Sequence, residues 1–121
     1  MRPLLKKEID TFLDRFGRFV DSEFRSIEIV SPSTVKITLA AQDSARGFDW
    51  ITVDLEFDGV SDANLPQSSK LPHLDMSDGV TLISKGDLFA FGVGSYDALS
   101  NITDSLCYIK AGSLKYSQGA F

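Results

Sequence analysis

The chain has 121 residues, 43% apolar and 24% charged, a composition that argues against disorder and fits one domain over residues 1–121 with one hydrophobic core. It lacks the roughly 18 to 20 consecutive apolar residues of a membrane helix, and its start becomes charged too early for a signal peptide. Its single cysteine excludes an intrachain disulfide, so a reducing, cytoplasmic setting is expected. The net charge of -5 resides entirely in residues 43–62, which hold six acids and one base, a concentration that disfavours nucleic acid and membrane partners and favours a basic protein surface.

Residues 4–20 are predicted to form an amphipathic helix. Apolar side chains recur there at spacings of three and four, which places them on one face. They are Leu5, Ile9, Phe12, Leu13, Phe16, Phe19 and Val20. Pro3 suits the first turn, where a missing N–H has no cost. Gly17 weakens the helix or marks a close approach to the sheet.

After the helix the apolar period changes to two, which is typical of β-strands. Strands are predicted over 27–30, 34–40, 49–59, 80–84, 88–93, 106–110 and 114–117. Residues 88–93 have two apolar faces and are expected to form a central strand, whose small Ala90 and Gly92 would let the helix pack closely. The fold class is therefore α+β, with the N-terminal helix packed on a curved, mostly antiparallel sheet of six to seven strands.

The strand over 49–59 is the most informative element. Ile51, Val53, Leu55 and Phe57 alternate with polar residues, so Asp54, Glu56 and Asp58 share the wet face. Their spacing of roughly 6.6 to 7 Å is too wide for adjacent carboxylates to share a metal ion without a bend. Two other interpretations stay open: a solvated face opposite Lys36 and Thr38 on the neighbouring strand, or an acidic protein-binding face.

Motifs for catalysis are weak. His73 is the only histidine, and Cys107 alternates within a strand, which is typical of a small packed side chain. No serine lies in a Gly-x-Ser-x-Gly motif, and residues 75–79 lack the spacing of a calcium loop. No catalytic residue, metal or cofactor is predicted.

Several strand patterns resemble those of a group of known proteins. The segments are Ile37-Thr38-Leu39, Ile51 to Val60, Asp78-Gly79-Val80, and Ile109-Lys110-Ala111 through Lys115-Tyr116. They are similar to small, largely uncharacterised bacterial α+β proteins, some of which are immunity proteins for contact-dependent or polymorphic toxins. The resemblance covers roughly residues 27–117. It implies a binding role and no catalytic residues.

The leading hypothesis is a non-enzymatic protein-binding module, most concretely an immunity-like inhibitor of a basic toxin domain. The residues expected to contact the partner are Asp43, Asp49, Trp50, Asp54, Glu56 and Asp58. Charge would speed association, and Trp50 would either anchor the interface or cap the core. Two alternatives remain. One is a ligand binder or enzyme with a pocket between helix and sheet, its entrance lined by the 61–78 loop, and the other is a structural homo-oligomer joined through strand edges or the Phe-rich face.

Overall fold

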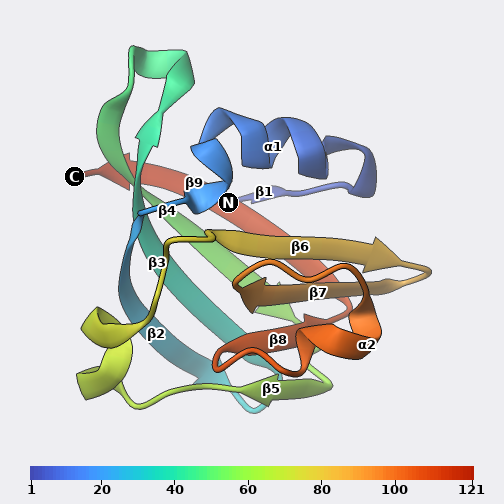
Figure 1. The fold of residues 1–121 in the computed structure, drawn as a ribbon. Coiled ribbons are helices and arrows are strands. Elements are labelled where there is room, and N and C mark those ends of the chain that lie inside the picture. The colour runs from blue at the N-terminus through green and yellow to red at the C-terminus, as the bar shows by residue number, and fades with distance from the viewer.

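The computed structural model describes residues 1–121 and has an α+β fold with two antiparallel sheets (Figure 1). Sheet A has the strand order β1–β9–β4–β3–β2, and sheet B has the order β5–β8–β7–β6. The strands of sheet A are β1 (Arg2–Pro3), β2 (Glu23–Ser31), β3 (Thr34–Asp43), β4 (Asp49–Asp58) and β9 (Ser113–Ala120). The strands of sheet B are β5 (Asp62–Asn64), β6 (Val80–Lys85), β7 (Leu88–Val93) and β8 (Tyr108–Ala111).

All seven predicted strands are present, but the prediction of one sheet was wrong. The chain changes sheets directly after β4, at Gly59, whose φ of +66° turns the backbone away from the strand direction. The next two amides then bond to different partners: Val60 N–H donates to Ser33 O, and Ser61 N–H donates to Lys110 O of β8. A period-two pattern reports which residues face the core, and it does not report which sheet a strand joins.

The N-terminal helix is shorter than predicted. The α-helix α1 covers Ile9–Arg15 and lies between two 3-10 turns, η1 (Lys6–Glu8) and η2 (Gly17–Phe19). Gly17, Arg18 and Phe19 all have positive φ, which ends the helix and directs the fully buried Phe19 ring onto Phe16, 5.5 Å away between centroids. Pro3 belongs to β1 rather than to a first helical turn.

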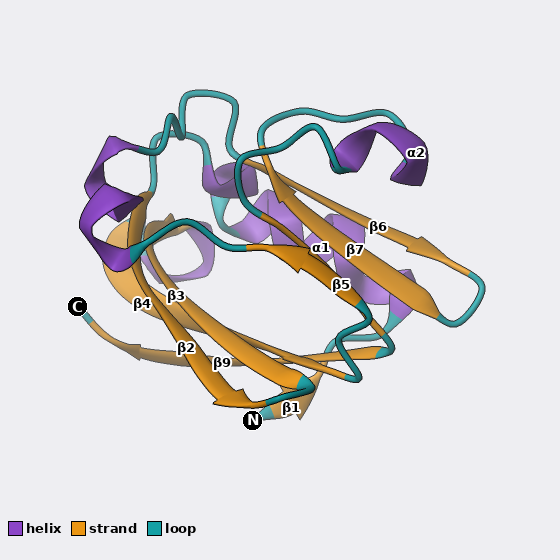
Figure 2. Cartoon of the chain, turned by 90° about the horizontal axis from the view of Figure 1, so that it is seen from below, coloured by secondary structure: helices purple, strands orange, loops and turns teal.

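Sheet B and α1 lie on the same side of sheet A (Figures 1 and 2). One cluster of 27 buried residues fills the space between these layers. Phe57 of β4 meets Phe91 of β7 at 5.5 Å between centroids, and Phe12 of α1 meets Tyr116 of β9 at 4.9 Å. The opposite face of sheet A has no layer over it (Figure 2). No helix in the structure is long and apolar enough to cross a membrane.

The strand β7 is central and covered on both faces, as predicted, but the helix over its small residues is a different one. The short helix α2 (Leu99–Ile102), in the connection between the predicted strands 88–93 and 106–110, packs its buried Ile102 against Gly92. A Cβ atom at position 92 would lie 2.7 Å from Ile102 Cγ1, so only glycine allows this approach.

We expect Gly92→Ala to destabilise the protein by roughly 1–3 kcal/mol, because the added methyl group forces the buried Ile102 and α2 away from β7. Chemical denaturation measures the loss. Gly112→Ala is the matched control, since its Cβ would come no closer than 3.8 Å to Asp58 O. Equal stabilities for the two variants would contradict this account of the contact.

Candidate binding surface

The uncovered face of sheet A carries the carboxylates of β4. Leu55 and its inward-facing neighbours in β4 enter the core, so Asp54, Glu56 and Asp58 alternate onto the outer face, where they are half-buried among neighbouring strands. In register, Glu56 lies between Lys36 of β3 and Lys115 of β9. The predicted opposition of the acidic strand to Lys36 and Thr38 is therefore confirmed.

Two of these carboxylates are held by threonines of β3. Thr38 Oγ1 donates to Asp54 Oδ1 at 2.6 Å, and Thr34 Oγ1 donates to Asp58 Oδ1 at 3.1 Å. Lys115 Nζ lies 3.8 Å from Asp58 Oδ2. Glu56 makes no hydrogen bond or ion pair of its own, because Lys36 Nζ turns to Glu28 at 3.7 Å. Glu56 is thus the most available negative charge of the three.

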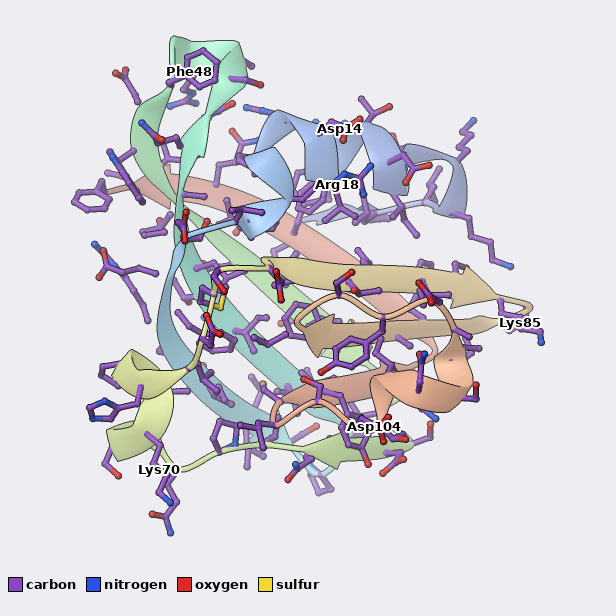
Figure 3. The ribbon with its side chains drawn as sticks, viewed as in Figure 1. Asp14, Arg18, Phe48, Lys70, Lys85 and Asp104 are labelled. Atoms are coloured by element: carbon purple, nitrogen blue, oxygen red, sulfur yellow. The ribbon has the colours of Figure 1, made fainter.

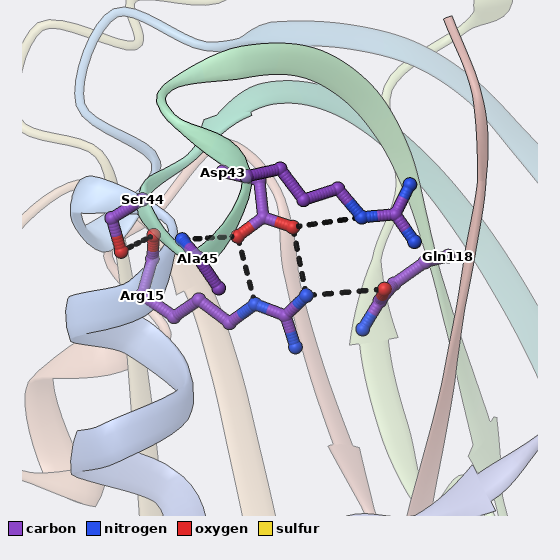
Figure 4. A network of polar contacts seen from close by, with 6 residues as sticks. Arg15, Asp43, Ser44, Ala45 and Gln118 are labelled. Atoms are coloured by element: carbon purple, nitrogen blue, oxygen red, sulfur yellow. Dashed lines mark hydrogen bonds and ion pairs between the residues drawn. The ribbon is translucent and has the colours of Figure 1, made fainter.

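Asp43 lies on the opposite side of the sheet from these residues. Its side chain is 0% exposed and accepts two bonds from Arg15 of α1, from Nε at 2.8 Å and from Nη2 at 2.7 Å (Figure 4). The amide of Ala45 adds a third bond, and Arg46 lies 3.7 Å away. Asp43 was predicted to contact a partner, but its buried side chain instead joins α1 to the β3–β4 hairpin. It is therefore not part of the candidate surface.

An aromatic cluster forms one end of the outer face. Trp50 (42% exposed) and Phe121 (59% exposed) lie 5.8 Å apart between ring centroids. The guanidinium of Arg25 from β2 covers the Phe121 ring at 4.3 Å and donates to its carbonyl at 3.3 Å. Trp50 was predicted, whereas Phe121 joins only because its position follows the last β4–β9 pair, Ile51 with Ala120.

Phe48 extends this aromatic end onto the tip of the β3–β4 hairpin. It is 63% exposed, has a φ of +66°, and stands at the projecting end of the molecule (Figure 3). A recess of about 290 Å³ separates this hairpin from η2, and Phe48, Trp50 and Val20 line it together with Asp14 and Asp21. Exposed apolar rings beside carboxylates suit a protein surface with both apolar and basic groups.

The cysteine, the histidine and the carboxylates of the chain do not come together in one cluster. Burial raises the pKa of the Cys107 thiol to about 12, which disfavours the thiolate that a nucleophile needs. His73 is exposed at the end of η4 (Ser68–His73), and no group of three or more His, Cys, Asp or Glu side chains is arranged to hold a metal ion. The space between α1 and the sheets is filled by the core cluster, and recesses lie at the surface.

Comparison with protein-family models, with curated proteins and with solved structures gave no match.

We expect Asp43→Asn to lower the free energy of unfolding by about 2–3 kcal/mol at neutral pH, because Arg15 loses its charged partner. The Arg15 hydrogen bonds hold the pKa of the Asp43 carboxyl below its ordinary value. Stability from this pair is therefore complete above the unfolded pKa of about 3.9, and it is lost as the pH falls through the lower pKa of the folded state.

Denaturation of wild type and variant between neutral pH and about pH 2 measures this difference, which should shrink with acid. Asp87→Asn, at an exposed hairpin turn, is the control and should change stability little at any pH. A wild-type advantage over Asp43→Asn that stays constant down to the lowest pH would contradict the assignment.

Proposed function

We propose that this chain is a non-enzymatic protein-binding module that docks a basic protein through the outer face of sheet A. The observation that carries the proposal is the combination on one uncovered face: exposed aromatic rings at one end and the carboxylates of β4 along its length. The proposed contact residues are Phe48, Trp50, Asp54, Glu56, Asp58 and Phe121. Asp49, which was predicted as a contact, pairs in register with Asp43 and shares the inward side of β4 with Ile51, so it is not part of this face.

The two ends of this face would contribute differently. Trp50 and Phe121 offer large apolar area with few rotatable bonds, which is the property of residues that dominate binding energy at interfaces. The carboxylates would mainly steer the partner and speed association, an effect that salt screens. Lys36 and Lys115 reduce the local negative field, so the aromatic end is expected to supply most of the affinity.

The most concrete form of the proposal is an immunity-like inhibitor that occludes a basic toxin domain. The strand patterns that resemble such proteins support it, as does a face that offers exposed aromatic rings beside carboxylates. Inhibition by occlusion requires a rigid surface of complementary charge and no chemistry from the inhibitor. The broad β-sheet face meets this requirement.

The first test neutralises the face without changing its shape. The variant is Asp54→Asn, Glu56→Gln, Asp58→Asn. At low salt we expect it to capture less than a tenth of the basic protein that the wild-type chain captures from a lysate of the native host, because the long-range attraction is lost. Quantitative mass spectrometry of the captured material measures this ratio. The amides can still accept the threonine hydrogen bonds seen at Asp54 and Asp58.

The control variant Asp87→Asn, Asp97→Asn, Asp104→Asn removes the same charge from exposed positions outside the acidic strand and should capture as wild type does. Equal losses in both variants would show a general charge effect and would contradict a specific face. Capture that is insensitive to both variants and to salt would overturn the proposal.

The second test addresses the aromatic end. Trp50→Ala is expected to weaken binding of the captured partner by at least tenfold, mainly through faster dissociation, because a hot-spot ring contributes about 2 kcal/mol or more. Surface plasmon resonance separates the two rate constants. Leu106→Ala, which removes another exposed apolar side chain, one that lies beside β5 of sheet B, is the control. An unchanged dissociation rate for Trp50→Ala would exclude Trp50 as the anchor.

A further inference from the structure

The strand β2 is the edge of sheet A. It has nine residues and pairs only with β3, so its other side offers unpaired backbone N–H and C=O groups, although η4 packs beside part of it. Neither lysine nor proline, two residues that commonly block such edges, occurs within it. Ile29 and Val30 near its end are 69% and 53% exposed.

A recess of about 530 Å³ runs beside the first part of this edge, between residues 21–25 and 71–77. The buried side chains of Phe24, Leu71 and Met76 contribute its apolar lining. Asp21 N–H donates to Met76 O at 2.8 Å, and beyond this bond no hydrogen bond joins residues 22–31 to the 71–77 segment. The segment therefore lies alongside β2 without pairing with it.

Charge and apolar side chains separate onto the two faces of β2. The register with β3 places Glu23 and Glu28 on the outer face with Lys36, whereas Phe24 and Ile29 face the core side with Leu39 and Val35. Asp21 and Asp75 add negative charge to the recess. Its one base, Arg25, is already engaged with Phe121 and with Glu23 at 3.7 Å.

We propose that the β2 edge receives an extended segment of the partner, with alternating basic and apolar residues, as an additional strand of sheet A. Backbone pairing with β2 supplies affinity, and alternate side chains supply specificity. The apolar residues lie over Phe24 and Ile29, and the basic residues lie on the outer face beside Glu23 and Glu28. This inference rests on the proposed function, since it assumes a basic protein partner.

A second copy of this chain is the competing occupant of the edge. Two β2 strands paired with each other would bring together acids that outnumber the single Arg25, and like charges across a strand pair are destabilising. Charge complementarity therefore selects a basic strand over self-association.

The probe is a blocked seven-residue peptide that alternates lysine and valine, and fluorescence anisotropy measures its affinity for the full chain. We expect binding that weakens at least fivefold in the variant Glu23→Gln, Glu28→Gln, Asp75→Asn and remains unchanged in the control variant Asp87→Asn, Asp97→Asn, Asp104→Asn. Hydrogen exchange is expected to slow at amides within residues 22–31 when the peptide binds. Equal weakening in the two variants, or unchanged exchange, would overturn the proposal.

Two further peptides separate backbone pairing from charge attraction. Each is N-methylated at alternate residues, one on the lysines and one on the valines, so that each has one edge that cannot donate. One of the two is expected to bind at least tenfold more weakly than the parent peptide, and equal binding by all three peptides would contradict strand addition.

The result of the peptide experiments can be distinguished from the results of the tests of the carboxylates and of Trp50. If the peptide fails to bind while Trp50→Ala still releases the captured protein, the edge proposal is wrong and the proposed function remains. If light scattering shows dimers that Glu23→Gln and Glu28→Gln strengthen, a second copy is the occupant and the proposal of a basic strand is overturned.

Discussion

The burial of alternate residues in β4 is the constraint on which the rest of the molecule depends. This strand is the centre of sheet A and pairs over its whole length with β3 on one side and from Ile51 to Asp58 with β9 on the other. Leu55 and Phe57 are fully buried between the two sheets, and a slip by one residue would place carboxylates in the core instead. Because the core fixes the register so strongly, the position of each acid on the outer face is fixed as well. The stability of the fold and the layout of the candidate surface thus have the same origin.

The Arg15–Asp43 pair performs a different task, because it adds a polar link between α1, whose apolar side chains join the core, and the β3–β4 hairpin. The β3–β4 hairpin projects beyond sheet A, and α1 has only seven residues. A bidentate contact between a buried carboxylate and a guanidinium is directional, so it fixes the angle between them. Gln118 of β9 also accepts from Arg15 Nη2 at 3.2 Å, which extends the network to a third element. The aromatic end of the surface depends on this arrangement, since Phe48 and Trp50 stand on the same hairpin.

The sequence predicted the features that depend on local periodicity and missed those that depend on distant partners. Seven strands, the central position of β7 and the outward face of β4 all follow from which residues alternate. Asp43 looked like one more acid of an exposed loop, because nothing near it in sequence reveals Arg15, 28 positions away. The division into two sheets depends on where Val60 and Ser61 find their acceptors, and the place of Phe121 depends on the β4–β9 register. These are tertiary contacts, which no local pattern contains.

The outer face and the β2 edge form one continuous region, because Arg25 reaches from β2 to the ring of Phe121 beside Trp50. A strand added to β2 would extend the same face that carries the carboxylates of β4. The negative charges of Glu23 and Glu28 then have two effects. They oppose the pairing of two identical edges, which is the usual hazard of an open strand, and they attract an edge of opposite charge. Under the proposed strand addition, an edge with this charge would select a basic partner strand. The net charge of the chain, which at first points only to β4, would then act through the sheet as a whole.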